Sequence, residues 1–338
     1  MINLKIPVGI SDFEKIRKNQ YYFVDKSGLI EELLNTESNE VTLITRPRRF
    51  GKTLGMSMLA SFFDIRRDSS ELFRGLKISQ KEELCQKWMN QYPVLFVTFK
   101  DVDGLDFQSA KEMLRIQIAD RCNEYLCLLS SEKVNENDKA IFRQLADVVK
   151  GDVSDAMLKT GIALIMRMLQ DYYEKPVILL LDEYDVPLAK ASAHGYYTEM
   201  LEVMRAMIST ALKDNPSLRF AVVTGCLRIA KESIFTGTNN FVSDTITDSR
   251  LNEYFGFVQS EVDQILADAE TEDQAENIRK WYDGYHFGDF DVYCPWDVMN
   301  YLLELQHNPQ AKPVSYWKNT SDNAIIRSFI DHSGSSIT

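Results

Sequence analysis

The chain has 338 residues, of which 45% are hydrophobic and 26% are charged. This ordinary globular balance argues against a disordered, collagen-like or disulfide-stapled chain, and the length predicts more than one compact unit. With 50 acidic and 38 basic side chains the formal net charge is −12. That charge disfavours broad electrostatic adhesion to DNA or anionic lipid, although it leaves room for a local basic patch.

The cysteines and the apolar runs indicate the compartment. Five scattered cysteines fit a reducing environment better than a disulfide framework, and without a CxxC pair we expect no structural zinc. The N-terminus lacks the apolar run of a secretory signal. The sequence also contains no stretch of roughly 18 apolar residues, so we expect no membrane span. We therefore expect a cytoplasmic protein with no membrane partner.

Short apolar runs and helical spacing alternate along the first 250 residues. Buried strands are predicted at 41–45, 94–99, 177–181 and 220–224. Apolar residues at helical spacing predict helices at 52–63, 109–129, 155–172 and 197–212. Strand and helix in this order predict an α/β fold in which helices cover both faces of a parallel sheet, that is, three layers.

The pattern changes beyond about residue 250. Helices are predicted over 260–269, with Ser260 as the N-cap, and over 278–285, 296–305 and 323–330. We therefore expect an α/β domain over 1–250 and a mostly helical lid or appendage over 251–338. The terminal HSGSSIT carries no folding signal and predicts a flexible tail or an early stop.

The sharpest motif is RPRRFGKT at 46–53, between a predicted strand and a predicted helix. This is the context of a phosphate-binding loop of the Walker A type. Gly51 would let the backbone approach phosphate, Lys52 would place its ammonium on the β- and γ-phosphates, and Thr53 would offer its hydroxyl to Mg²⁺. The residues expected to contact the nucleotide are Arg48, Arg49, Phe50, Gly51, Lys52, Thr53 and Leu54.

The motif departs from the usual G-x-x-x-x-G-K-[ST] pattern. Arg46 stands where the first glycine belongs, and Pro47 removes one N–H donor. The alternative is a surface Gly-Lys-Thr turn without a ligand. The arginines at 46, 48 and 49 could grip phosphate or a partner carboxylate, but solvated loop charges are the simpler interpretation.

A second motif, VILLLDEYD at 177–185, ends a buried strand in adjacent carboxylates. Asp182 matches the acid that orients Mg²⁺ in phosphate-loop enzymes, and Glu183 could act as the general base on the attacking water. Without a cation, repulsion between the two should raise at least one pKa. The alternative is a charged strand end with solvated side chains.

The order of the motifs predicts a further strand between the phosphate-loop strand and the acidic strand. This is the plan of the additional-strand catalytic-glutamate class, with ligands at the carboxyl ends of the strands. Thr224 would then sense the γ-phosphate, and Arg228 could compensate charge in the transition state. The alternatives are a strand-end hydrogen bond for Thr224 and a solvated or partner-facing charge for Arg228.

Several segments together resemble one family. The chain is similar to the AAA-ATPase-like family of bacterial proteins over nearly all of 1–330, in IPVGISDFE at 6–14, YFVDKS at 22–27, RPRRFGKT at 46–53, LLDEYD at 180–185 and WYDGY at 281–285. The resemblance implies a phosphate-loop ATPase fold, makes the missing first glycine a family trait, and favours ATP over GTP. Many relatives continue into a domain resembling PD-(D/E)XK nucleases; this chain ends where that domain would begin, so we expect no nuclease activity in it.

Two further segments have competing interpretations. In related ATPases the segment before the phosphate-loop strand often borders adenine, which would place residues 1–30 beside the nucleotide. Asp25 and Lys26 could then contact it, although a helix start capped by Ser27 is the simpler interpretation. The aromatic run at 281–287 predicts packing between the appendage and the ATPase body rather than base stacking on single-stranded nucleic acid.

These patterns combine into a functional hypothesis. We expect a Mg²⁺-dependent ATPase that cleaves the β–γ bond, with Lys52 and the loop amides on phosphate, Thr53 and Asp182 on Mg²⁺, and Glu183 on water. The alternatives are an ATP-dependent switch or scaffold with negligible turnover, an ATPase that regulates a nucleic-acid-processing activity, and an interaction module with a vestigial site. The sequence does not identify a protein partner or distinguish it from a second copy of the chain.

Overall fold

The structure is a computed structural model that describes residues 4–35, 40–149, 153–226, 235 and 241–316. The predicted helix at 323–330, the terminal HSGSSIT and Arg228 lie outside the described residues. Among the described helices, none combines the length and the apolar character needed to cross a bilayer.

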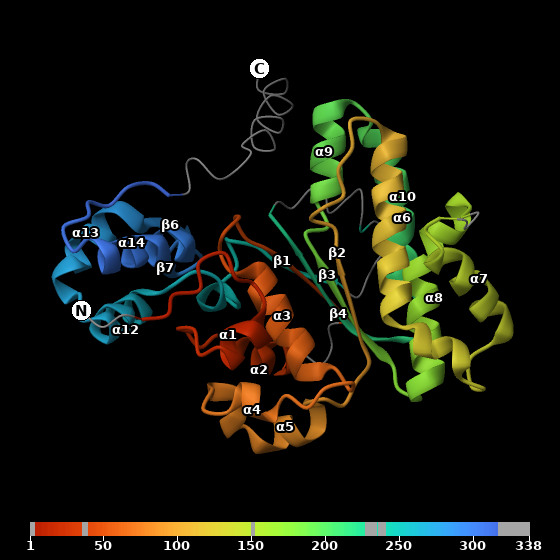
Figure 1. Ribbon diagram of the computed structural model, residues 1–338, viewed down its shortest axis with the longest axis horizontal. Coiled ribbons are helices and arrows are strands. Elements are labelled where there is room, and N and C mark those ends of the chain that lie inside the picture. The colour runs from red at the N-terminus through yellow and green to blue at the C-terminus, as the bar shows by residue number, and fades with distance from the viewer. Residues whose placement is uncertain (1–3, 36–39, 150–152, 227–234, 236–240, 317–338) are drawn as a thin grey trace.

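A five-stranded sheet forms the centre of the molecule (Figure 1). Its order is β2-β3-β4-β1-β5, and all neighbouring strands are parallel. The strands are β1 (Val41–Thr45), β2 (Val94–Thr98), β3 (Val177–Asp182), β4 (Leu218–Gly225) and β5 (Phe241–Asp244). The four predicted strands are confirmed, and β4 lies between β1 and β3 as expected. The sequence analysis missed β5, whose four residues FVSD contain no apolar run.

Helices cover both faces of the sheet, which confirms the three layers. One face packs on α6 (Phe107–Glu124), α8 (Asp155–Tyr173), α9 (Val186–His194) and α10 (Tyr197–Leu212), with α7 (Glu136–Ala146) against α6 and α8. The other face packs on α1 (Phe13–Lys18), α2 (Gly28–Asn35), α3 (Lys52–Phe63), α4 (Ser70–Phe73) and α5 (Glu82–Trp88).

The interior strand β3 shows why the apolar runs form strands. Leu179 and Leu181 point into the first core, whereas Ile178 and Leu180 point into the second. Because successive side chains of a strand alternate between faces, a mostly apolar run is favoured between two helical layers.

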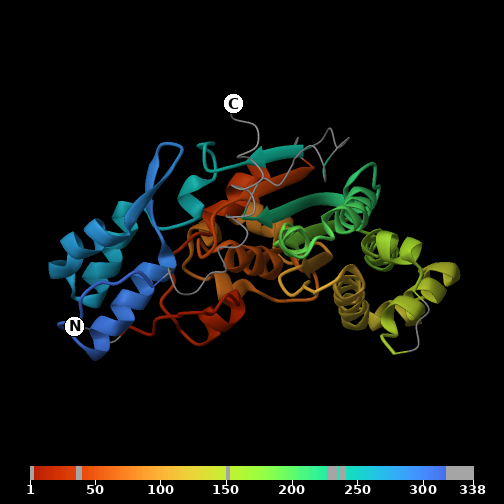
Figure 2. The same cartoon turned by 90° about the horizontal axis from the view of Figure 1, so that it is seen from above.

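Residues 251–316 form a second unit on one side of the sheet, and α7 lies at the opposite end of the molecule (Figures 1 and 2). Its core is separate from the two cores of the sheet and also takes in Ile6 of the N-terminal segment. Its elements are α12 (Gln259–Ala269), α13 (Ala275–Tyr282), α14 (Pro295–His307) and an antiparallel hairpin of β6 (Asp283–Phe287) and β7 (Phe290–Tyr293).

Two expectations for this unit are wrong. Residues 283–285, predicted as the end of a helix, begin β6, because pairing with β7 places Phe287 opposite Phe290 and outweighs the helical spacing. Ser260 is not the N-cap of α12. The helix begins at Gln259, Val258 takes the cap position, and the Glu261 carboxylate accepts the Val258 N–H at 2.9 Å.

The N-terminal segment joins the two units. The Leu4 carbonyl accepts a hydrogen bond from Gln306 at 2.9 Å, and the Tyr22 hydroxyl donates to Asp268 at 2.7 Å. Lys26 lies 2.6 Å from the Glu261 carboxylate, so its ammonium binds the second unit. Ser27 immediately precedes α2, but its hydroxyl accepts the Ile78 N–H at 3.1 Å. These contacts fasten residues 251–316 to the sheet domain.

The burial of β3 predicts a large penalty for truncating it. Replacing the fully buried Leu179 with alanine should lower the free energy of unfolding by about 2–5 kcal/mol, because contacts are lost and a cavity remains. Leu105, which is 82% exposed, is the matched control, and its alanine variant should stay within about 0.5 kcal/mol of wild type. Denaturant titration of both variants measures the difference.

Candidate functional site

The loop between β1 and α3 takes the shape of a helix-capping turn. Arg49 and Gly51 both adopt left-handed backbone, with φ of 73° and 85°. Gly51 occupies the N-cap position of α3, where its φ favours glycine. The first N–H groups of α3 have no acceptor within the helix, and they carry the positive end of its dipole. The loop therefore presents the features of an anion-binding helix start.

The Lys52 ammonium lies inside the curve of this loop. It donates to the carbonyl oxygens of Arg46 at 2.9 Å and Pro47 at 2.8 Å, and it lies 3.5 Å from the Cys226 sulfur. The residue is only 5% exposed. A buried ammonium at the start of α3 places a positive charge beside the helix N-terminus, where an anion would be favoured.

Three side chains from three elements meet beneath the loop. The Thr53 hydroxyl, from the first turn of α3, donates to Asp182 Oδ2 at 2.9 Å. The Thr224 hydroxyl, from β4, donates to Asp182 Oδ1 at 2.5 Å. Asp182 is fully buried at the carboxyl end of β3, so these bonds satisfy a carboxylate that is shielded from solvent. The structure thus brings together residues that lie 129 and 42 positions apart.

Glu183 follows Asp182 in strained backbone. Its φ of 55° is left-handed, which is uncommon for a residue with a side chain. Burial raises the pKa of the half-buried Glu183 carboxyl, the charges of Asp182 and Asp185 raise it further, and Lys52 and Arg48 act in the opposite direction. The raised pKa agrees with the expectation for adjacent carboxylates.

The turn after β3 packs tightly against the end of β4. Asp185 accepts the Cys226 N–H at 2.9 Å, and the Tyr184 N–H donates to the Thr224 carbonyl at 3.2 Å. A Cβ at Gly225 would lie 2.5 Å from the Tyr184 ring and 2.8 Å from Asp185 Oδ1. Only glycine therefore lets β4 end this close to the acidic turn.

The position of Arg46 contradicts its interpretation as a solvated loop charge. Its guanidinium is fully buried, not solvated. It donates to the Asp244 carboxylate at 2.5 Å and to the Asn252 side-chain oxygen at 2.7 Å, and it lies 5.5 Å and 5.7 Å from the ring centres of Phe255 and Phe287. The residue that replaces the first glycine thus holds the loop to β5 and the second unit.

The next loop residues also contact the second unit. Phe50 is buried, with its ring centre 4.8 Å from that of Tyr285 and 5.2 Å from that of Phe287. The Arg49 guanidinium lies 3.8 Å from the centre of the Trp296 ring. Packing between the aromatic run and the sheet domain is therefore confirmed for Tyr285 and Phe287.

Four residues at the site were not singled out from the sequence: Cys226, Asp244, Asn252 and Trp296. Cys226 is two residues beyond Thr224, so its place just after the fourth predicted strand was a sequence signal that it lies near the site. Asp244 closes the short strand β5, which was missed. Asn252 and Trp296 reach the loop only through the docking of the second unit, for which the sequence carries no local signal.

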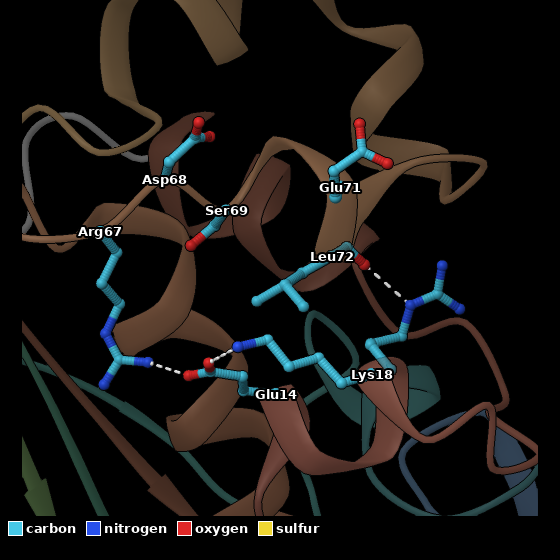
Figure 3. A pocket seen from close by; sticks show the side chains of 8 residues that line it. Glu14, Lys18, Arg67, Asp68, Ser69, Glu71 and Leu72 are labelled. Carbon is cyan, nitrogen blue, oxygen red and sulfur yellow. Dashed lines mark hydrogen bonds and ion pairs between the residues drawn. The ribbon is translucent and has the colours of Figure 1, made fainter.

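A separate pocket of about 390 Å³ is lined by residues of α1 and of the segment 67–72, which follows α3, whereas the loop of residues 46–53 precedes α3 (Figure 3). Two of its cations share one carboxylate. Lys18 and Arg67 both point to Glu14, at 2.5 Å and 2.7 Å, and Arg17 donates to the Leu72 carbonyl at 2.7 Å.

The donor set beneath the loop fits Mg²⁺ bound with a phosphate. Mg²⁺ takes oxygen ligands, keeps several waters, and needs only one or two carboxylates when substrate phosphates complete its shell. A hydroxyl at Thr53 beside a carboxylate at Asp182 is such a set. The described residues contain no group of three or more His, Cys, Asp or Glu side chains that could cage a metal, so phosphate and water would have to supply the remaining ligands.

These features define an α/β protein with a sheet and loop consistent with a phosphate-loop core. The family model described as "Predicted AAA-ATPase" matches residues 7–235, more than half of the chain, so the protein belongs to the AAA-ATPase-like family. Membership suggests ATP binding or ATPase activity.

A curated relative extends the match beyond the family model. It is an uncharacterized protein in the vnfD 5′ region of Azotobacter chroococcum mcd 1, 29% identical over 327 residues. The alignment covers 95% of this chain and 55% of the relative, so the chain spans about half the length of that protein.

The buried ion pair at Arg46 yields a stability prediction. Arg46→Met removes the closest cation from Asp244 and should cost about 3–5 kcal/mol in the free energy of unfolding, because the carboxylate stays buried. The double variant Arg46→Met with Asp244→Leu should recover most of the loss. Denaturant titration of both tests this, and a single variant as stable as wild type would refute it.

Proposed function

We propose that the protein binds Mg·ATP at the loop of residues 46–53 and hydrolyses its β–γ bond. The observation that carries the proposal is the contact between Thr53 and Asp182 at 2.9 Å. It joins the helix start that would receive phosphate to the acidic strand end that would orient the metal. In a surface Gly-Lys-Thr turn without a ligand, the threonine hydroxyl would not be expected to contact a fully buried aspartate.

Each residue has a distinct role in this proposal. Lys52 and the N–H groups of residues 48–54 bind the β- and γ-phosphates, and the helix dipole adds to their attraction. Thr53 and Asp182 hold Mg²⁺, which when bound neutralises charge that develops on the phosphate oxygens. Glu183 accepts the proton of the attacking water, and Thr224 keeps the Asp182 carboxylate oriented while it senses the γ-phosphate.

The strand order supports the finer class within the family. The position of β4 between β1 and β3 supports assigning the sheet to the plan of the additional-strand catalytic-glutamate enzymes. In that plan the glutamate follows the metal-orienting aspartate, as Glu183 follows Asp182. The raised pKa of Glu183 would fall when Mg²⁺ binds beside it, because a nearby cation favours the charged carboxylate.

The alternatives differ from the proposal in one measurable step. An ATP-dependent switch or scaffold would bind Mg·ATP with negligible turnover. An ATPase that regulates a nucleic-acid-processing activity would turn over faster with DNA or RNA, although the net charge of −12 gives this little support. A cytoplasmic location stays a prediction from the cysteine content.

Lys52 provides the binding test. Lys52→Ala should weaken Mg·ATP binding at least about tenfold, because a buried phosphate-facing ammonium is lost. The control is Lys18→Ala, whose side chain is 64% exposed and lines the separate pocket. Isothermal titration calorimetry compares both with wild type, and equal affinity in the Lys52 variant would remove this lysine from the site.

Glu183 provides the turnover test. Glu183→Gln should abolish phosphate release while leaving Mg·ATP binding intact, because an amide cannot accept the proton of water. A phosphate-release assay measures turnover, and calorimetry on the same variant measures Mg·ATP binding, so the two effects are separated. Unchanged release would remove Glu183 from the role of base, and binding without release in wild type would favour the switch.

A further inference from the structure

The loop of residues 46–53 contacts the second unit through three of its residues, Arg46, Arg49 and Phe50. We propose that Trp296 is a positioning residue for this loop, so that the C-terminal unit helps to shape the nucleotide site. The claim about the loop's conformation stands on its contacts alone, and only its effect on ATP rests on the proposed function.

The first argument is the strained backbone of Arg49. A residue with a side chain rarely adopts a φ of 73°, and such a conformation persists only where its surroundings hold it. The Arg49 guanidinium lies over the Trp296 ring at 3.8 Å. Tryptophan offers the strongest aromatic face for a cation, so this contact can favour the strained conformation.

The second argument is the socket that receives the neighbouring residue. Phe50 packs with Phe287, Val292 and Cys294 in one buried cluster, against which Trp296 also packs. Gly256, with φ of 95°, forms part of the wall, because a Cβ there would lie 3.1 Å from the Phe50 ring. The ring of Phe50 therefore enters a site shaped for it, just before Gly51 and Lys52.

The third argument is that the socket is rigidly attached to the second unit. Phe257 and Tyr293 exchange backbone hydrogen bonds at 3.0 Å and 2.8 Å, which ties the hairpin to the segment before α12. The Trp296 carbonyl accepts from Asn300 at 2.6 Å within α14. A support that is itself fixed can set the loop's shape, and by thermodynamic linkage a ligand on the loop would in turn favour the docked unit.

Hydrogen exchange on the ligand-free full chain tests the positioning directly. Trp296→Ala should speed exchange of the amides in peptides covering residues 46–54 by about tenfold or more, because the loop loses its support. Trp281→Ala is the matched control, since this tryptophan belongs to the same unit, is 52% exposed and lies outside the hydrophobic cluster around Phe50. Unchanged exchange in the Trp296 variant would overturn the proposal.

A double-mutant cycle separates positioning from general packing. Arg49→Gly removes the conformational strain, because glycine adopts a left-handed φ at no steric cost. In that background Trp296→Ala should change loop exchange far less than it does in the native chain. An equally large change in both backgrounds would show that Trp296 only packs the unit, and would overturn the positioning role.

Calorimetry with Mg·ATP then connects the loop to the nucleotide. Trp296→Ala should weaken binding about tenfold, Trp296→Phe less, and Trp281→Ala not at all. If loop exchange rises while wild type binds no Mg·ATP, the positioning stands and the proposed function fails. If wild type and Trp296→Ala bind equally, the inferred effect on the nucleotide site is wrong and the proposed function stands.

Discussion

The carboxylate of Asp182 is the constraint on which the candidate site depends. A charge that is fully buried requires hydrogen-bond donors, and here the hydroxyls of Thr53 and Thr224 supply them. These bonds connect the first turn of α3 to the ends of β3 and β4. The helix start and the acidic strand end are therefore held in one geometry, and any phosphate or cation bound there would meet an arrangement already formed.

A second buried charge shapes the other side of the loop. Arg46 replaces the customary glycine, and its ion pair with Asp244 and its bond to Asn252 anchor the loop entrance to β5 and the second unit. Left-handed backbone occurs instead at Arg49 and Gly51. The loop thus uses side-chain anchors where the common pattern uses a flexible residue, and this makes its shape depend on residues 251–316.

The sequence predicted the sheet well because β1 to β4 are apolar on both faces, and a short, doubly buried run allows few other structures. It failed where tertiary contacts outweighed local preference. Residues 283–285 have helical spacing but form part of a strand that pairs with β7. Val258, not Ser260, is the N-cap of α12, because the Glu261 carboxylate accepts the Val258 N–H. Arg46 looked like a solvated charge because its partner, Asp244, closes a strand too short to be noticed.

By itself, the sequence determined the order of β1 to β4 and of the long helices α3, α6, α8 and α10, the loop at 46–53, and the acidic pair that ends β3. Each of these features is encoded in a contiguous stretch of residues. The tertiary structure alone decided that Asp182 faces Thr53, that Arg46 is buried, and that Trp296 and Phe287 lie against the loop of residues 46–53. These contacts join segments far apart in the chain. They follow from the parallel order of the sheet and the docking of the second unit, which no local pattern encodes.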